Sequence, residues 1–502
     1  MSKPNILLFL PDQHRGDVMG CAGNAAAITP HLDRLASRGV LFERCATNGP
    51  LCMPARASLM TGQHVNRHGV WGNNLLEADR AGPSHVRRIR DAGYHTAMFG
   101  KTHLYANHRN DGHTREHAWK LREWGFETVH ELRDVVPTSR CTCHYADFLA
   151  ARGRLRVYQD YTRLWWTGAF RGAKPWEDPP SILPTEEHID MYCATQAAQW
   201  IRNYQEDKPF YLQVCFTGPH TPFDAPPEYR ARFTPENVPA PILEAPAEPV
   251  SAQVRQMLAA SRMDGMTETL GRVMASHYYA KVSLIDDAVG LVTQALADAG
   301  FENETWIIYT SDHGEMLGDH GLGQKKVFYE GALRVPLIVT PPGGTVGWHT
   351  RGLTDHLDVA ATLLEAADAG PLPDSPGRSL VPAVAGASRA HRGKDAVFSE
   401  VEAYYAMARD DRYKMTIDAR TGATVELYDM ANDPLELENR VEEPGLRGLR
   451  RDMVNEYFGR LAIDRTKLDT YQRRVAAGGY RDTFLHDLRR QFDGVREHVK
   501  ER

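Results

Sequence analysis

The sequence predicts an α/β protein, with a large, mostly parallel sheet sandwiched by helices and a smaller C-terminal α+β subdomain. Four strand-like runs, the first of them continuously apolar, alternate with longer helix-like segments. Strands that are apolar throughout are typical of parallel sheets buried on both faces. Pro371, Pro373 and Pro376 then interrupt the pattern. Because proline clusters mark loops, we expect one domain over residues 1–372 and a second over residues 373–502.

Each element of this arrangement can be placed along the chain. The predicted strands of the large sheet cover residues 5–10, 95–99, 210–217 and 305–310. The predicted helices cover residues 30–38, 187–204, 274–299 and 357–367. In the second domain, turn residues separate short strands at residues 396–399, 404–409, 413–417 and 425–429, which is typical of a small antiparallel unit.

Polar residues follow each of the four long strands. They are Asp12 and Gln13 after the first, Lys101 and His103 after the second, His220 after the third, and Asp312 and His313 after the fourth. Open α/β sheets bind ligands beyond the carboxyl ends of their strands. We therefore expect these side chains to line one crevice.

Composition excludes several classes of protein. The 59 lysines and arginines nearly balance the 65 aspartates and glutamates, so we expect no nucleic-acid partner and no binding to an anionic membrane. No segment approaches the apolar length of a membrane span. The 7 cysteines are an odd number without the spacing of a disulfide framework, which predicts mostly reduced thiols. We expect a cytoplasmic protein.

The segment from Cys52 to Gly62 predicts a helix that begins at the cysteine. Pro54 suits the first helical turn, and Gly62 suits its end. A helix N-terminus carries free N–H groups and a partial positive charge. A nucleophile at Cys52 would therefore lie beside a natural anion site, with Arg56 one turn further along.

The same segment resembles the signature of the sulfatase family, in which a cysteine, a proline two residues on and an arginine two beyond precede a Thr-Gly pair. The resemblance extends from about residue 4 to about residue 440. It implies an alkaline phosphatase-like fold and hydrolysis of a sulfate monoester, here a small aryl or alkyl sulfate. It also implies that a formylglycine-generating enzyme oxidises Cys52 to formylglycine, whose hydrate attacks the ester.

The resemblance further implies a site for one divalent metal ion. Its ligands would be Asp12, Gln13, Asp312, His313 and the modified side chain at Cys52. Two carboxylates and an amide oxygen suit a hard cation, so Ca²⁺ is our first expectation. Because an imidazole favours softer ions, Mn²⁺ is the alternative.

Further roles follow from the match to family motifs. Lys101 and His103 match a Gly-Lys-x-His element in which the lysine contacts the sulfate and the histidine handles a proton of the hydrate. His220 matches a Pro-His-x-Pro element that faces the leaving group. Lys325 is the expected lysine between sulfate and nucleophile, with Lys326 as the fallback. Asn73 and Asn74 are candidates for substrate contact.

Two other functions stay open at this point. A sister group of phosphonate monoester and phosphodiester hydrolases also uses formylglycine, but it has Tyr and Thr at the positions of Lys101 and His103. A catalytically inactive binding homologue would be expected to have lost a ligand or the cysteine.

We also expect a homo-oligomer, a dimer or tetramer, because the charged helix-like tail at residues 480–502 has little core of its own to join. The region at residues 105–180, rich in tryptophan and arginine, matches no motif.

Overall fold

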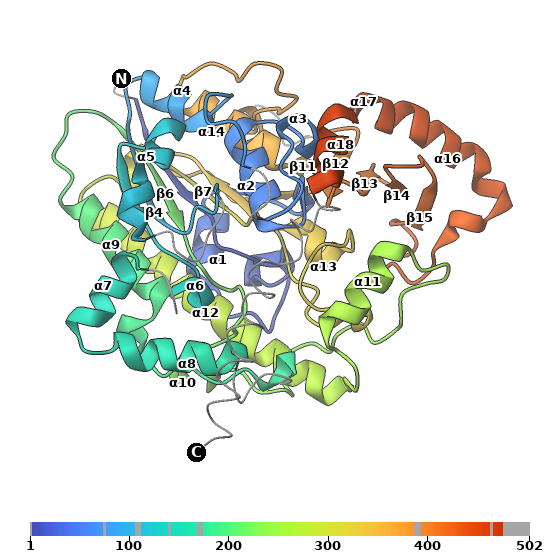
Figure 1. The fold of residues 1–502 in the computed structure, drawn as a ribbon. Coiled ribbons are helices and arrows are strands. Elements are labelled where there is room, and N and C mark those ends of the chain that lie inside the picture. Colours follow the sequence, from blue (N-terminus) through green and yellow to red (C-terminus); the bar gives the residue numbers. More distant parts are fainter. Residues whose placement is uncertain are drawn as a thin grey trace.

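The computed structural model describes residues 3–73, 77–105, 112–138, 142–167, 174–385, 393–461 and 465–474. Its centre is an eight-stranded sheet with the order β10-β2-β9-β7-β1-β6-β4-β5 (Figure 1). All neighbouring strands are parallel except at β9, which runs antiparallel to β2 and β7. The strands are β1 (Asn5–Phe9), β2 (Val40–Phe42), β4 (His95–Gly100), β5 (Thr128–Glu131), β6 (Phe210–Cys215), β7 (Thr305–Thr310), β9 (Leu337–Thr340) and β10 (Trp348–Thr350).

Strand β1 shows why the sheet is buried on both sides. Ile6 and Leu8 belong to one hydrophobic cluster, whereas Leu7 and Phe9 belong to another on the opposite face. Successive side chains of a strand point to opposite faces, so an unbroken apolar run requires a layer of helices on each side. The prediction of a parallel sheet covered by helices is thereby confirmed.

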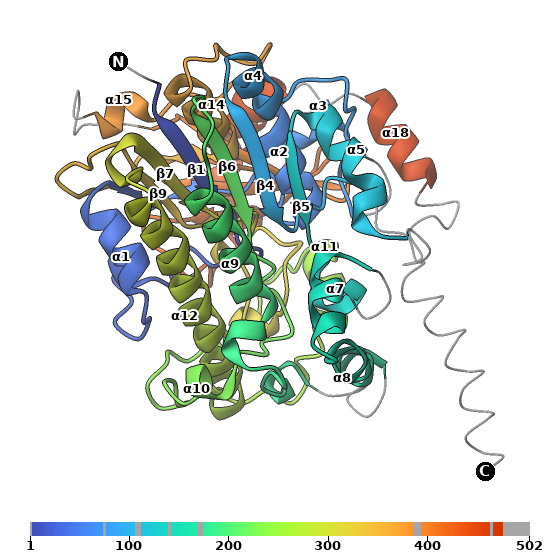
Figure 2. The same ribbon diagram turned by 90° about the vertical axis from the view of Figure 1, so that its left-hand side faces the viewer.

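A different set of helices covers each face of the sheet (Figure 2). One face packs against α1 (Pro30–Ser37), α9 (Ile189–Arg202) and the long α12 (Glu268–Asp298). The other face packs against α2 (Cys52–Thr61), α4 (His85–Asp91) and α14 (His356–Ala366). Peripheral helices include α3 (Val65–His68), α5 (Thr114–Trp124), α6 (Val135–Thr138), α7 (His144–Ala151), α8 (Leu155–Thr167), α10 (Pro227–Arg230), α11 (Ala252–Ser261), α13 (Glu330–Leu333) and α15 (Val381–Val384).

A smaller antiparallel unit follows at the C-terminus. Its four strands pair in sequence order, β12 (Val397–Val401), β13 (Tyr405–Arg409), β14 (Tyr413–Asp418) and β15 (Thr424–Asp429). The helices α16 (Arg447–Met453), α17 (Gly459–Leu461) and α18 (Arg465–Arg474) complete it. A three-stranded sheet, β11 (Thr354–Asp355), β3 (Cys45–Ala46) and β8 (Arg334–Val335), lies in the first 372 residues. The predicted C-terminal subdomain is confirmed as an antiparallel β unit with helices.

Two element boundaries differ from the prediction for identifiable reasons. Helix α12 begins six residues before residue 274, because Thr267 caps it by accepting a hydrogen bond from the Leu270 N–H. Strand β6 ends at Cys215 because the N–H groups of Thr217 and Gly218 bond the Asp190 carboxylate instead of a neighbouring strand. Side-chain competition for backbone donors of this kind is invisible in an apolar run.

Some predictions fall outside the described residues, namely Asn74 and the tail at residues 480–502. Among the helices that the structure does describe, none combines the length and apolar character that a membrane crossing requires.

In the Trp-rich region, Trp124 and Trp176 are buried in the interior while Trp119 is 47% exposed. Two of these tryptophans therefore have a packing role.

Candidate active site

The four long strands with polar ends lie next to one another in the sheet, in the order β7, β1, β6, β4. All four run in the same direction, so their carboxyl ends meet at one edge. The Asp12 N–H donates to the Gly218 carbonyl at 3.0 Å, which ties the segment after β1 to the segment after β6. The structure thus brings Asp12, Lys101, His220 and Asp312 to the same edge.

Helix α2 delivers Cys52 to this edge. The helix begins at Cys52 and ends at Gly62, whose φ of 64° is the left-handed conformation that glycine adopts without strain. The Met53 N–H donates to Asn73 Oδ1 at 3.0 Å. Asn73 therefore supports the first turn of the nucleophile helix, and its side-chain oxygen faces the protein backbone.

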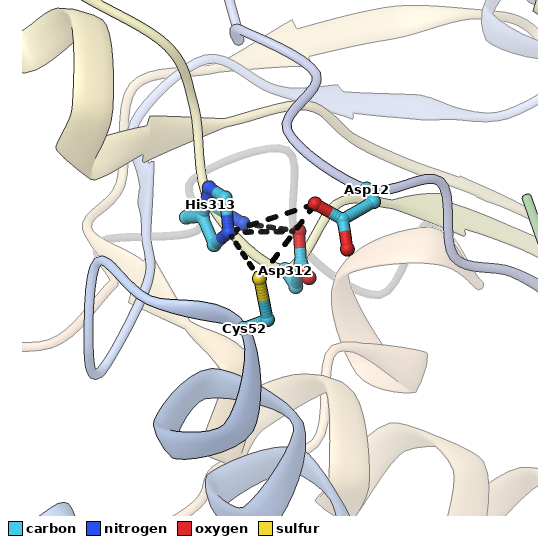
Figure 3. Close-up of side chains that lie close together, drawn as sticks. All are labelled: Asp12, Cys52, Asp312 and His313. Carbon is cyan, nitrogen blue, oxygen red and sulfur yellow. Dashed lines mark hydrogen bonds and ion pairs between the residues drawn. The ribbon is translucent and has the colours of Figure 1, made fainter. Parts of the chain in front are cut away.

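Four side chains gather around one point (Figure 3). Cys52 Sγ lies 3.2 Å from His313 Nε2 and 3.8 Å from Asp12 Oδ1. His313 Nε2 in turn lies 3.7 Å from both Asp12 Oδ1 and Asp312 Oδ1. All four residues are at most 2% exposed. They form a buried cluster drawn from three separate segments of the chain.

The donor set of this cluster fits a divalent cation. Nδ1 of His313 contacts the Gly314 carbonyl at 2.9 Å and must donate to it. The lone pair of the neutral ring is therefore on Nε2, which faces the two carboxylates and is the usual position for metal binding. Gln13 lies beside the cluster. Its backbone N–H donates to Asp312 Oδ1 at 3.0 Å, and its amide oxygen accepts from Lys325 Nζ.

Arg56 holds the two carboxylates of the cluster in place. Its Nε donates to Asp312 Oδ2 at 2.8 Å, and a terminal nitrogen donates to Asp12 Oδ2 at 3.2 Å. The other terminal nitrogen donates to the Lys101 carbonyl at 2.5 Å. The guanidinium is 2% exposed. A planar, permanently charged group with several donors suits such a buried junction better than an ammonium group does.

Charges around Cys52 favour its ionised form. Burial and the neighbouring Asp12 carboxylate favour the neutral thiol, but Lys325, Lys101 and His313 outweigh them and lower the pKa of Cys52 to about 5. Similarly, burial acts to raise the pKa of Asp12, yet Lys101, His220 and Arg56 hold it well below its usual value. The site thus stabilises negative charge at position 52.

The two predicted catalytic histidines lie within electrostatic range of Asp12 in the cluster. Nδ1 of His220 donates to the Thr221 carbonyl at 2.7 Å. Nε2 is therefore the ring nitrogen that this hydrogen bond does not occupy. Burial and Lys325 lower the pKa of His220, whereas Asp134 and Asp12 act to raise it. Within the described residues, both ring nitrogens of His103 are buried without a hydrogen-bond partner. Burial and Lys101 lower the pKa of His103 to about 3, so its ring is neutral but is a weak base.

The structure separates the two candidate lysines. Lys325 is 6% exposed and bonds Gln13, and its charge acts on Cys52 and His220. The ammonium of Lys326 lies 2.6 Å from the Glu402 carboxylate. Lys325 is therefore the lysine that faces the site.

Three supporting carboxylates were not predicted from the sequence. Asp134 lies 2.6 Å from Lys101 Nζ, Glu315 accepts from Gln13 Nε2, and Asp190 accepts from Thr217 and Gly218 beside His220. The sequence offers a signal for Asp134 and Glu315, because both residues follow the carboxyl ends of strands in the sheet. Asp190 lies inside helix α9 and reaches the site only through tertiary packing.

Comparison with known proteins defines the class to which this fold and site belong. The family model described as "Sulfatase" matches residues 4–369, and a model of the C-terminal region of N-sulphoglucosamine sulphohydrolase matches residues 318–460. The chain belongs to the sulfatase family, within the alkaline phosphatase superfamily.

Individual relatives cover almost the whole chain. It is 28% identical to an arylsulfatase of Clostridium perfringens over 91% of this chain and 95% of that protein. It is 31% identical to a choline-sulfatase of Rhizobium meliloti over 88% of this chain and 83% of the relative. The crystal structure of a phosphonate monoester hydrolase of Agrobacterium radiobacter superimposes with a TM-score of 0.75 at 26% identity, covering 91% of this chain and 95% of that one.

Proposed function

We propose that this protein hydrolyses a sulfate monoester, a small aryl or alkyl sulfate, to an alcohol and inorganic sulfate. The observation that carries the proposal is the contact of Cys52 with the cluster of Asp12, Asp312 and His313, since it places the side chain of the family's nucleophile among metal ligands. Family membership and the arylsulfatase and choline-sulfatase relatives support the same reaction class.

Conversion of Cys52 to formylglycine by a formylglycine-generating enzyme is part of the proposal. The modified side chain, when hydrated, would supply the attacking hydroxyl. Asp12, Asp312, His313 and the oxygen of Gln13 would hold one divalent cation, Ca²⁺ first and Mn²⁺ as the alternative. Such an ion supplies Lewis acidity toward a sulfuryl oxygen and toward the nucleophile.

The chain's own cations prepare the site for an anion. Arg56 forms ion pairs with both Asp12 and Asp312 and fixes their orientation. Lys325 and Lys101 place positive charge next to Cys52, where the sulfate group of the substrate must lie for attack on its sulfur. Preorganised charge in a site shielded from water stabilises a transition state strongly, because it needs no rearrangement during the reaction.

Two histidines are placed to move protons. His103 is neutral, and neither of its ring nitrogens is hydrogen-bonded to the described part of the chain, so the ring is free to take up the proton of the hydrate that must leave before sulfate departs. Because Nδ1 of His220 is engaged by the Thr221 carbonyl, Nε2 is the nitrogen that, when protonated, can donate to the departing alcohol. Lys325, whose charge also acts on His220, is the alternative donor.

The proposal includes a homo-oligomeric, cytoplasmic enzyme. The charged, helix-like sequence of residues 480–502 supports the oligomer, and the expectation of mostly reduced cysteines supports the location. Light scattering coupled to size exclusion, on the full chain and on a chain ending at residue 474, would test the oligomer. We expect the shortened chain to lose the oligomer. An unchanged number of subunits would exclude the tail as the contact between them.

The alternative is hydrolysis of a phosphonate monoester or phosphodiester. It is favoured by the likeness to the Agrobacterium radiobacter enzyme, whereas Lys101 and His103 favour sulfate. Rates of aryl sulfate and aryl phosphonate monoester hydrolysis on one enzyme preparation, with Cys52→Ala as the blank, decide between them. A larger kcat/KM for the sulfate is expected, and a larger value for the phosphonate would reverse the assignment. Turnover of neither ester by formylglycine-containing enzyme would favour the inactive binding homologue.

A further inference from the structure

Asp134 is a partly buried carboxylate at the site with no role in the proposed reaction. It follows strand β5, three residues after Glu131, and its side chain is 15% exposed. Its Oδ1 accepts the Val135 N–H at 2.8 Å, at the start of helix α6. Its other oxygen, Oδ2, lies 2.6 Å from Lys101 Nζ. The residue therefore joins a fixed backbone position to a lysine of the site.

Lys101 is held between two carboxylates. Its Nζ lies 2.6 Å from Asp12 Oδ2 and 2.6 Å from Asp134 Oδ2, and the lysine side chain is only 4% exposed. An ammonium on a flexible four-carbon stem has no fixed position of its own. Two charge-assisted hydrogen bonds from anchored acceptors limit where it can lie. The contact with Asp134 thus restrains the position of the Lys101 ammonium relative to the cluster.

The charge of Asp134 also reaches His220. Burial and the ammonium of Lys325 favour the neutral ring of His220, and Lys101 acts in the same direction. The carboxylates of Asp134 and Asp12 oppose them. Of these two carboxylates, Asp12 is a cluster ligand already paired with Arg56. Asp134 is therefore the outer-sphere acid whose removal would change the proton affinity of His220 without removing a metal ligand.

We propose that Asp134 is a positioning residue for the hydrolysis reaction, which fixes the ammonium of Lys101 beside Asp12, at the sheet edge that also carries His220. The inference rests on the proposed function, because it assigns Asp134 a role through Lys101 and His220. A residue that only stabilises the loop after β5 would affect folding without changing the pH dependence of the reaction.

Asp134→Asn is the informative substitution, since asparagine keeps the shape and an oxygen for the Val135 N–H but removes the charge. Glu187→Gln is the matched control, because Glu187 is also 15% exposed and pairs with Arg152 and Arg154 away from the cluster. We expect Asp134→Asn to lower kcat/KM about 10- to 100-fold, the range found for outer-shell partners of metal sites, and the control to stay within about twofold, as is usual for such substitutions.

The pH profile separates positioning from mere stability. If His220 is the proton donor, kcat/KM falls as pH rises through the pKa of His220. Removing Asp134 lowers that pKa, so the decline must begin at lower pH in Asp134→Asn. The loss should also be greater for phenyl sulfate than for 4-nitrophenyl sulfate, whose leaving group needs a proton less. Asp134→Glu, which restores the charge, should recover part of the rate.

Two results would overturn the proposal. One is a rate for Asp134→Asn within twofold of wild type, and the other is an equal loss at every pH and for both esters. If Asp134→Asn does not fold, Asp134→Ser takes its place, and misfolding of both would make Asp134 a structural residue. Failure of the proposed function is distinguishable, because it would appear in the wild-type preference for phosphonate, whereas the Asp134 test uses variant-to-wild-type ratios with whichever ester is hydrolysed.

Discussion

The sulfur atom of Cys52 lies 3.2 Å from Nε2 of His313. Burial opposes charge on the His313 ring, but the Asp312 carboxylate and a Cys52 thiolate raise the pKa of His313. At the sulfur, Lys325, Lys101 and His313 overcome burial and the Asp12 carboxylate and lower the pKa of Cys52 to about 5. Before any modification or metal binding, each of the two groups therefore favours the charged form of the other.

This relationship predicts a distinctive thiol titration. In unconverted, metal-free protein, the ultraviolet absorbance of thiolate in wild type minus that in Cys52→Ala should rise as pH passes through about 5. The sign follows from the lowered pKa, since the group loses its proton at lower pH than an ordinary cysteine. Burial raises the pKa of the other described cysteines, namely Cys21, Cys45, Cys143, Cys193 and Cys215. A difference signal that rises only near pH 9 would contradict the charge balance at the site.

Substitution of Cys52 by serine should separate attack from release. A serine hydroxyl can accept the sulfuryl group but cannot expel it as an aldehyde forms, so Cys52→Ser should release at most one equivalent of alcohol per site. Steady turnover should fall by about 10⁴-fold or more, in line with losses of other nucleophiles. Stopped-flow measurement of the phenol from an aryl sulfate tests this. Cys52→Ala, which lacks the hydroxyl, should show no burst, and continued turnover by Cys52→Ser at the wild-type rate would refute the scheme.

Removal of the metal should abolish activity reversibly. Dialysis against a chelator is expected to inactivate the enzyme, and addition of Ca²⁺ or Mn²⁺ should restore it, with metal content measured by mass spectrometry. His313→Ala should weaken metal binding by more than the about 10- to 100-fold that outer-shell changes cost. His349→Ala is the control, since its ring is 50% exposed and lies near Glu43 instead of the cluster. Full activity in metal-free protein would exclude the metal site.

The adjacent lysines provide an internal comparison. Lys325→Met should reduce kcat/KM about 10²- to 10³-fold, the size of effect expected when one preorganised charge at a reacting centre is lost. Lys326→Met should change it only a few-fold, because Lys326 pairs with Glu402. Circular dichroism on both variants controls for folding. Equal losses from the two substitutions would contradict the assignment of Lys325 to the site.

The sequence was sufficient where one local pattern determines the structure. The run Ile6–Leu10 is apolar throughout, and its first four residues form a central parallel strand together with Asn5. The segment Cys52–Thr61 carries a proline near its start, is followed by a glycine, and forms the nucleophile helix. The carboxyl ends of parallel strands meet at one edge of a sheet, and this rule alone predicts that Asp12, Lys101, His220 and Asp312 lie together.

The sequence was insufficient where a contact joins distant segments. The place of Asp134 after strand β5 brings it to the edge of the sheet, but the local sequence does not specify its pairing with a lysine 33 residues away. Asp190 reaches the His220 loop from within a helix. Asn73 lies near the nucleophile helix as expected, but its oxygen bonds the Met53 N–H. Such partners depend on tertiary packing, which composition and spacing do not encode locally.

The chemical state of residue 52 tests the formylglycine mechanism without relying on any variant. Active enzyme purified from its native host can be digested, and the peptide containing residues 52–56 analysed by tandem mass spectrometry. We expect an aldehyde at position 52, in a fraction that scales with specific activity across preparations. Fully active enzyme in which position 52 is entirely an unmodified cysteine thiol would contradict the mechanism.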